Sequence, residues 1–534
     1  MITATLTKTL SGLGQSRENG GWTGVATHSH MLRSHNVDYE GAKANLVEWA
    51  RSNHVGAVGV GSPWEPVSAQ HYGHYEKAER DRYFSGLVPP ESVMDCEPIG
   101  ALIRDLNARG EGRTLFYLDN ETPKNRHGHL WYVGFDYRVP GWHDYSQDHR
   151  VRFWDGDPCE DPNVLTGGCH IRRSYAEVVA EQRRAGALAI WAHPTSWWIH
   201  QGAFVTNIAA ELVLHLHADG FLDGMVVQGY DACHRAYQAL WFDLLDRGAC
   251  VPGYAELDAC YDKLPIAEAG TFLNYVPETR DALKLTAIAD KLRAARHYIS
   301  SGPHLAMTVD GHPMGSHLAS NAGKTHAVVL AAWPAPGEKL LSRVELLGRG
   351  GKVLAHVDGF AGGTLEFDVL GDEEGGYVLG RAFGEHDSPA GQRQQSIRHC
   401  ALTNPVYLEA RLTPKHQPVK TELTIELATD SPAVGAAFSM LSAGGDVLEK
   451  GVFWHRETCL KANPCGRLNM EYPDGRTRDI PIAMANADAR KHINYLADGG
   501  FLKDWQGLEP GEVPVSAFRF DEMRKALASQ RLIL

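Results

Sequence analysis

The chain has 534 residues, of which 43% are hydrophobic and 22% charged, and its 52 Lys and Arg against 65 Asp and Glu give a formal net charge of −13. This composition is typical of a folded protein of two or three domains and excludes an intrinsically disordered chain. The acidic balance argues against nucleic acid as a partner, because phosphate-backbone binding requires clustered basic side chains. No apolar run approaches the roughly 20 residues of a membrane helix, so we expect no membrane partner.

The start of the chain and its cysteines bear on location. Residues 1–8 lack the basic start, apolar centre and small-residue cleavage site of a secretory signal. Nine cysteines are scattered without the close pairs of a small disulfide scaffold. Both observations predict a cytoplasmic protein with reduced thiols.

Short apolar runs alternate with helix-like segments in the first 300 residues. The runs lie at residues 55–60, 114–118, 187–192 and 224–227. The helix-like segments that precede them lie at residues 42–52, 99–109, 175–185 and 209–217. Buried strands that each follow a helix are typical of a parallel α/β sheet or barrel, in which functional residues gather after the strands' C-terminal ends. Polar residues directly after these runs are therefore candidates for a site.

The pattern changes after about residue 303. Strand-like segments at residues 327–333, 365–369, 405–411 and 421–427 are separated by turns rich in Gly and Asp, which predicts an antiparallel β-sandwich-like domain. A helix-like segment at residues 517–530 lies near the end of the chain. We therefore expect three parts, at residues 20–303, 304–412 and 413–534, the last a C-terminal extension with strands and a terminal helix.

Histidine is abundant, and 16 of the 27 histidines lie before residue 235. His28 and His30 are two residues apart, so on a strand both imidazoles would project to one side and could bind the same cation. Glu121 comes after the apolar run at residues 114–118, and His129 follows eight residues later. A carboxylate can bridge two ions, with the histidine returning to the second. The alternatives are a surface pair for the first motif and a solvated loop for the second.

Two further segments place polar residues after apolar runs. His193 follows the run at residues 187–192, where the alternative is a hydrogen-bonded core histidine. Asp258 follows the apolar stretch at residues 249–252, and nearby Cys260 is either a soft ligand or a buried thiol. Four such segments at successive strand ends favour a mixed histidine and carboxylate metal cluster.

This ordered set resembles the PHP (polymerase and histidinol phosphatase) superfamily, specifically its carbaryl-hydrolase-type metallohydrolases. The family's HxH element matches His28 and His30, its Glu followed by Gly-His matches Glu121 and His129, and its Ala-His-Pro matches His193. Segments at residues 296–303, 305–311 and 401–407 are similar to the end of that family's barrel and to its appended β-domain. The resemblance covers about residues 24–411. It implies the α/β class, with a distorted TIM-like (β/α)7 barrel followed by a β-sandwich-like domain.

The chain departs from the family pattern at three places. Gly59 and the residues after it stand where the family usually has Asp-His, Cys260 replaces the His of a final Asp-x-His, and Gln228 stands where a Glu is often found. These losses fall mainly on a third metal position, so the resemblance implies two divalent ions (Zn, Mn or Fe), with a mononuclear site as the alternative. One ion would be bound by His28, His30, Glu121 and Asp258, and the other by Glu121, His129 and His193.

The implied site predicts a hydrolase. Two ions that share Glu121 would lower the pKa of a bridging water and polarise the attacked group. We expect a metal-bound hydroxide to attack an ester, carbamate or amide, with Glu121, His193 and Asp258 as catalytic residues and Asp258 orienting the nucleophile or moving its proton. The alternatives are a phosphoesterase of a small molecule, a lyase or isomerase acting on a carbohydrate-like substrate with the same metals, and a catalytically silent binding module.

Aromatic residues near the proposed ligands bear on the substrate. Trp131 and Trp197 are close to them in the sequence, although packing in the core is the alternative role. Together with Gln228 and Tyr254 they would line the pocket of a small aromatic or ring-containing substrate. The C-terminal extension could pack on the barrel or form the subunit interface of a homo-oligomer.

Overall fold

The structure is a computed structural model. It describes residues 2–11, 21–30, 39–61, 97–121, 130–133, 186–192, 198–200, 203–205, 217–218, 220, 222–229, 234–257, 259–260, 272–277, 284–388, 397–409, 420–442, 445–463, 466–482 and 528–534. At some element ends, His30 and Glu121 among them, only the backbone is described.

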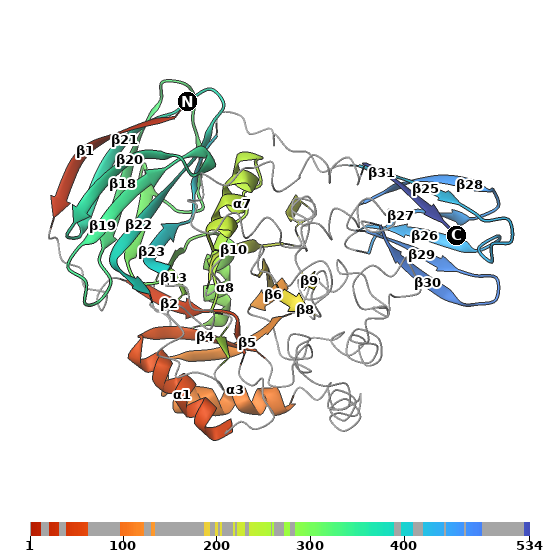
Figure 1. The fold of residues 1–534 in the computed structure, drawn as a ribbon, viewed down its shortest axis with the longest axis horizontal. Coiled ribbons are helices and arrows are strands. Elements are labelled where there is room, and N and C mark those ends of the chain that lie inside the picture. The colour runs from red at the N-terminus through yellow and green to blue at the C-terminus, as the bar shows by residue number, and fades with distance from the viewer. Residues whose placement is uncertain are drawn as a thin grey trace.

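Strands dominate the described residues, of which 52% lie in strands and 16% in helices. The described helices are α1 (Tyr39–Ser52), α3 (Glu97–Arg109), α7 (His234–Asp246) and α8 (Leu285–Arg293) (Figure 1). The prediction of a distorted TIM-like (β/α)7 barrel is therefore wrong, because such a barrel is rich in helices. None of the described helices is long and apolar enough to cross a membrane.

One large mixed sheet contains most of the strands described between residues 22 and 300. They are β2 (Trp22–Ala26), β3 (Ser29–His30), β4 (Val55–Gly61), β5 (Leu115–Glu121), β6 (Leu130–Val133), β7 (Leu188–Trp191), β10 (Gly224–Gln228), β11 (Gly253–Ala255), β12 (Ala259–Cys260), β13 (Leu273–Pro277) and β14 (Tyr298–Ser300). β2, β4 and β5 are parallel neighbours, as are β7, β10 and β11. β6 lies antiparallel between β5 and β7 and joins the two parallel groups. Antiparallel neighbours need no crossover helix between them.

The predicted elements of this half exist where the structure describes them. The four apolar runs form β4, β5, β7 and β10, and the first two helix-like segments lie within α1 and α3. The helix-like segment at residues 175–185 lies outside the described residues, as does most of the segment at 209–217. α1, α3 and α7 contact β4, β5 and β10, and their apolar side chains share one core with those strands. β8 (Trp198–His200) and β9 (Ala203–Val205) form a separate hairpin.

A β-domain follows β14 and also contains the first described strand of the chain. Its strands are β1 (Thr3–Ser11), β15 (His304–Val309), β16 (His312–Pro313), β17 (His317–Ala319), β18 (Thr325–Trp333), β19 (Leu341–Leu347), β20 (Val353–Phe360), β21 (Gly363–Leu370), β22 (Gly376–Ser388), β23 (Ile397–Thr403) and β24 (Val406–Glu409). Five of them form a sheet in the order β1-β21-β18-β15-β16. β1, red in Figure 1, pairs antiparallel with β21. The N-terminal strand thus belongs to a sheet more than 300 residues away in sequence, which no local pattern indicates.

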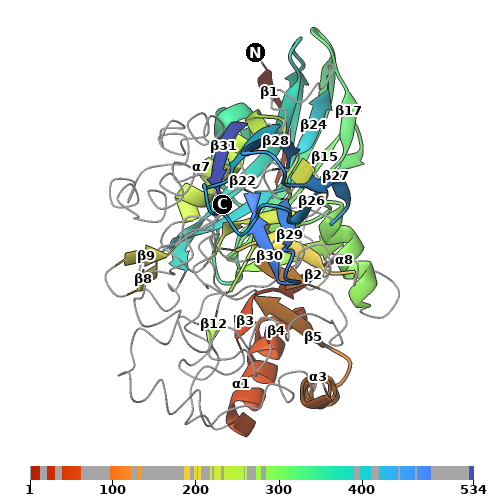
Figure 2. The ribbon, with the colours of Figure 1, turned by 90° about the vertical axis from the view of Figure 1, so that its right-hand side faces the viewer.

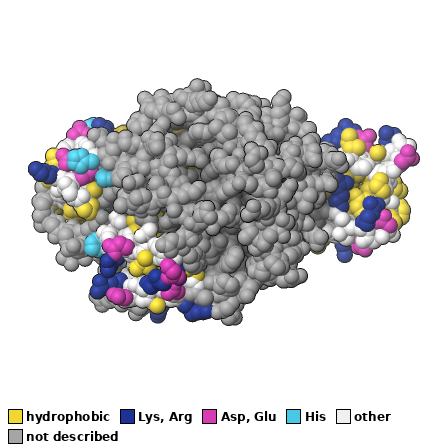
Figure 3. Space-filling model, turned by 60° about the horizontal axis from the view of Figure 1, so that its bottom comes forward, with side chains coloured by type: hydrophobic (Ala, Val, Ile, Leu, Met, Phe, Trp, Pro, Cys, Tyr) yellow, Lys and Arg dark blue, Asp and Glu magenta, His cyan; other side chains and the backbone are white. Residues whose placement is uncertain are grey.

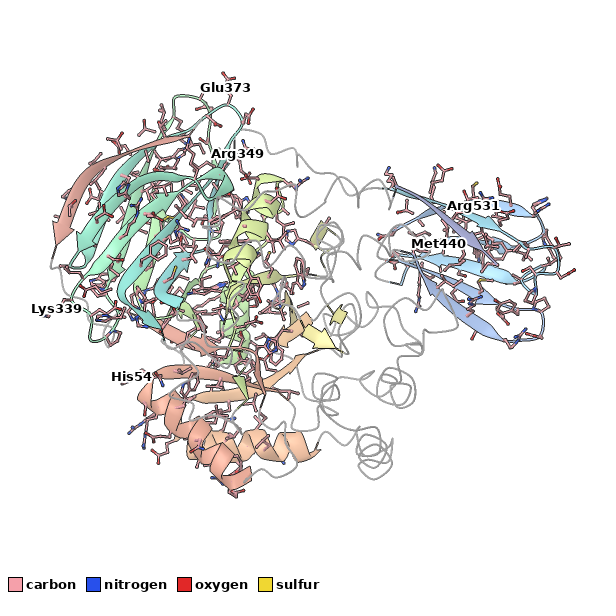
Figure 4. The ribbon with its side chains drawn as sticks, viewed as in Figure 1. His54, Lys339, Arg349, Glu373, Met440 and Arg531 are labelled. Atoms are coloured by element: carbon pink, nitrogen blue, oxygen red, sulfur yellow. The ribbon has the colours of Figure 1, made fainter. Side chains whose placement is uncertain are left out.

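The C-terminal strands form a unit with a core of its own. The unit consists of β25 (Thr421–Glu426), β26 (Ala437–Leu441), β27 (Val447–Val452), β28 (Glu457–Ala462), β29 (Arg467–Glu471), β30 (Thr477–Pro481) and β31 (Ser529–Ile533) (Figure 2). Met440 is buried in this core, whereas Arg531 pairs with Glu426 on the surface; Figure 4 labels Met440 and Arg531. β31 includes the end of the segment expected to be a helix at residues 517–530, most of which lies outside the described residues.

β27 is an edge strand with exposed apolar side chains. Val447 and Leu448 are each more than half exposed, and Trp454 directly after the strand is 69% exposed. Figure 3 shows hydrophobic side chains among basic ones on this unit. Glu449 and Lys450 lie within the strand, and charges at such positions oppose edge-to-edge pairing between chains.

The joint between the large sheet and the β-domain contains a buried histidine with a structural role. The imidazole of His297 is fully buried, and its Nε2 donates to the carbonyl oxygen of Gly253 at 2.8 Å. Burial lowers the pKa of His297 to about 4, although the hydrogen bond to Gly253 opposes that shift. The abundance of histidine therefore does not by itself indicate ligands.

His297 makes stability depend on pH. Its pKa is about 6.5 in an unfolded chain, so between pH 6.5 and 4 the unfolded state binds a proton that the folded state does not. The free energy of unfolding should therefore fall as pH decreases through this window, by up to about 3 kcal/mol from this group. We expect urea unfolding of His297→Gln to show a loss between pH 7 and 4.5 that is smaller by about 2 kcal/mol. An unchanged pH dependence would assign the titration to other groups.

Candidate functional site

Four buried side chains meet where strands of the large sheet end. His28 follows β2, Asp119 lies near the end of β5, Glu256 follows β11, and Trp131 lies on β6. All four are at most 1% exposed. Burying two carboxylates and an imidazole is costly unless the groups bond to one another, so their meeting requires a specific arrangement.

His28 is held from three directions. Its Nδ1 lies 2.7 Å from Oε2 of Glu256, and its backbone N–H donates to Oδ2 of Asp119 at 3.1 Å. The imidazole stacks on the indole of Trp131, with ring centroids 3.8 Å apart and planes 24° from parallel. The backbone of His28 is in the left-handed region, with φ 62°, which is uncommon for a residue other than glycine. These contacts fix both the backbone and the ring of His28.

The contact with Glu256 determines the tautomer of a neutral His28. A carboxylate only accepts hydrogen bonds, so the ring proton lies on Nδ1 and the lone pair lies on Nε2. Histidines that bind metals are commonly held in this way, with the second ring nitrogen donating to a carboxylate. The Glu256 contact therefore gives His28 the tautomer of an Nε2 ligand.

Two glycines make room for the two carboxylates. A Cβ on Gly59 would lie 1.9 Å from Oδ2 of Asp119, and a Cβ on Gly229 would lie 3.0 Å from Cγ of Glu256. Gly59 begins the stretch where the family resemblance led us to expect an Asp-His pair. The structure shows that this position accommodates the side chain of Asp119 instead.

The structure describes only some of the predicted metal ligands. The side chain of His28 is described and belongs to the cluster. For His30 and Glu121 the backbone pairing is described: the Cα of His30 pairs with those of Gly61 and Cys260, and the Cα of Glu121 pairs with that of Trp131. Three predicted ligands lie outside the described residues: His129, His193 and Asp258. Within the described part of the chain, no three His, Cys, Asp or Glu side chains form a group that could hold a metal ion.

The predicted substrate-binding residues occupy different surroundings. Trp131 lies against His28, whereas Trp197 is outside the described residues. The hydroxyl of Tyr254 donates to the carbonyl oxygen of Leu292 at 2.9 Å. The amide of Gln228 donates to Oγ of Ser301 and to the carbonyl oxygen of Cys400, each at 3.1 Å. Oε1 of Gln228 is buried without a hydrogen-bond partner among the described residues, so one acceptor there can serve a ligand.

Asp119 and Glu256 were not predicted as site residues. Each lies two positions before a predicted one, Asp119 before Glu121 and Glu256 before Asp258. The signal available in the sequence was a carboxylate that directly follows an apolar strand, and it was present for both. The sequence could not show that both side chains contact His28.

Comparison with protein-family models and with curated proteins finds no match. Among solved structures, a variant of the major pilin subunit of Bacillus cereus aligns at 11% identity, with 34% of this chain and 64% of the pilin covered and a TM-score of 0.14. The unmodified pilin aligns at 11% identity over 34% of this chain and 67% of the pilin, with a TM-score of 0.13. The chain thus spans less than two thirds of the pilin variant that it matches. TM-scores this low carry no argument about fold or function.

Proposed function

We propose that the chain is a metal-dependent hydrolase whose site is built around His28. The observation that carries this proposal is the buried pair of His28 and Glu256, in which the carboxylate orients the imidazole and places its lone pair on Nε2, the tautomer of a metal-binding histidine. The expected substrate is a small aromatic or ring-containing ester, carbamate or amide.

Among the described residues, His28 supplies one donor of a kind that suits a divalent metal ion. Its imidazole nitrogen suits Zn, Mn or Fe, while Glu256 and Asp119 bond to its ring and its backbone in a buried cluster. His28 would hold the metal with the ligands that the PHP resemblance implies: His30, Glu121, His129, His193 and Asp258. A bound divalent metal would supply the activation of water and the polarisation of the attacked group.

Three described residues, Glu256, Asp119 and Trp131, hold His28 in position. Glu256 fixes the tautomer and the ring orientation of His28, and Asp119 holds the backbone at the same residue. Trp131 covers one face of the imidazole and keeps water from it, which strengthens the electrostatic interactions within the cluster. An indole at this place also favours a substrate with a ring.

Metal analysis and one substitution test the proposal. Protein expressed with Mn, Fe or Zn should contain at least one equivalent of metal and cleave an aryl ester, and we expect His28→Ala to lose most of the bound metal and at least about 99% of the turnover. His312→Ala on exposed strand β16 is the matched control and should keep both. Less than one equivalent of metal in the wild type, or wild-type turnover in His28→Ala, would contradict the proposal. Cleavage of an aryl phosphate alone would change the substrate class to phosphoesters.

A further inference from the structure

A second cluster of reactive groups lies in the β-domain, and the proposed metal site does not use it. Its members are Asp310, His326 and Ser320. Asp310 is in the turn between β15 and β16, His326 is on β18, and Ser320 directly follows β17. β15 and β18 are paired strands, and β17 pairs with β24.

In this cluster Ser320 donates a hydrogen bond to His326, and His326 donates one to Asp310. Oδ2 of Asp310 lies 2.8 Å from Nδ1 of His326, and Nε2 of His326 lies 2.9 Å from Oγ of Ser320. Partial burial alone would raise the pKa of Asp310, but the bonds from His326 and from the backbone N–H of Ala327 lower it below its ordinary value. An ionised Asp310 accepts the proton on Nδ1, so Nε2 of a neutral His326 carries the lone pair. Ser320 must therefore donate its hydroxyl hydrogen to Nε2.

The backbone holds these groups in place. Asp310 and Gly311 form a two-residue hairpin turn with φ values of 49° and 77°, as in a type I′ turn. Oδ1 of Asp310 also accepts the N–H of Ala327 at 2.8 Å, which fixes the carboxylate. His326 lies on the buried face of β18 and is itself 0% exposed. The acid and the base are therefore more rigidly placed than surface groups would be.

Ser320 lies at the margin of the buried region. Ser320 is 6% exposed, and the residues that follow it, 321–325, are exposed. The backbone of Gly371 packs against one side of the hydroxyl, since a Cβ on Gly371 would lie 2.3 Å from Oγ of Ser320, so a substrate must approach from another side.

We infer that Asp310, His326 and Ser320 form an acyl-transfer site of the Ser-His-Asp type, because such sites are recognised by geometry and not by order in the chain. Oγ of Ser320 attacks the carbonyl carbon of a small ester, and the hydroxyl proton moves to Nε2 of His326. The bond from carbon to the leaving oxygen breaks, and that oxygen takes the proton from Nε2. Water then cleaves the acyl-serine by the same proton route and releases the acid. The narrow exposure of Ser320 restricts the substrate to small acyl groups with good leaving groups.

Covalent labelling of the full chain tests the inference without a known substrate. We expect a fluorophosphonate probe to form an adduct on Ser320 of the folded wild type, located by peptide mass spectrometry. Asp310→Asn keeps the shape but favours the opposite tautomer of His326, so it should label at least about 100-fold more slowly. Ser316→Ala, a half-buried serine on the same segment, is the matched control and should label as the wild type does.

Two arms separate this site from the metal site and from misfolding. Labelling should persist in EDTA and in His28→Ala, so failure of the proposed hydrolase leaves this result unchanged. Labelling of Ser320 is measured first in the wild type, so the inference can be tested even if Asp310→Asn does not fold. The absence of an adduct on Ser320 in the folded wild type, while a known serine hydrolase in the same mixture is labelled, would overturn the inference. Equal labelling of a folded Asp310→Asn would also overturn it and leave the cluster with a structural role.

Discussion

Gly59→Ala is expected to destabilise the protein by about 3 kcal/mol and to abolish metal-dependent activity. The added Cβ would lie 1.9 Å from Oδ2, 2.5 Å from Cγ and 2.8 Å from Cβ of Asp119. Because the overlap reaches the Cβ of Asp119, rotation of the carboxylate alone cannot relieve it. Either β4 and β5 separate or Asp119 loses its bond to the backbone N–H of His28. Urea unfolding measures the first effect, and turnover of an aryl ester measures the second.

A second strand glycine in the same sheet provides the control. A Cβ on Gly24 would meet Leu273 Cδ1 at 3.3 Å and Tyr275 Cε1 at 3.4 Å, and both are atoms of side chains that can shift slightly. Gly24→Ala should therefore change the free energy of unfolding by no more than about 1 kcal/mol and preserve activity. If Gly59→Ala and Gly24→Ala had the same free energy of unfolding, the prediction that a Cβ at Gly59 collides with Asp119 would be contradicted.

Several strands and helices of the first half could be predicted, but the antiparallel strand β6 between β5 and β7 could not. Continuous apolar runs identified β4, β5, β7 and β10 because buried strands need apolar side chains on both faces. The same composition serves parallel and antiparallel neighbours. The short antiparallel strand β6 (Leu130–Val133) has no turn motif that marks its direction, so the barrel prediction did not include it between β5 and β7. β1 was missed because its partner β21 is more than 300 residues away.

The candidate site could be predicted in part for a similar reason. His28 was found because alternate residues of a strand share a face. That same period of two places Asp119 and Glu121 on one face and cannot rank them. Glu256 contacts His28 across 228 positions of sequence, and only the fold shows that contact. Gly59 counted in the sequence as the loss of a ligand, whereas its missing side chain is what gives Asp119 its place.

The second large effect concerns Glu256 as a positioning residue. Glu256→Gln is expected to lower the affinity for Zn²⁺ by about 10–100-fold while the fold persists. A glutamine keeps the volume and can still accept a hydrogen bond from Nδ1 of His28, but it has no charge to increase the basicity of the ring. The free energy of unfolding of the metal-free protein should fall by no more than about 1.5 kcal/mol, because one charged hydrogen bond becomes a neutral one. Titration with Zn²⁺ against a competing chelator measures the affinity.

A buried carboxylate outside the site, Glu345, serves as the control, because its substitution should lower stability and leave the Zn²⁺ affinity unchanged. Glu345 in the β-domain is 3% exposed, and its two oxygens accept from Arg343 at 2.6 Å and Arg381 at 2.7 Å. Glu345→Gln leaves the buried Arg381 without its counter-charge, so it should lower stability by about 3 kcal/mol and leave the Zn²⁺ affinity unchanged. If Glu256→Gln bound Zn²⁺ as tightly as the wild type, the carboxylate would only satisfy a buried hydrogen bond. If both variants weakened Zn²⁺ binding equally, the loss would reflect general destabilisation. A crossed result, with affinity lost in one variant and stability in the other, would assign Glu256 to the metal site.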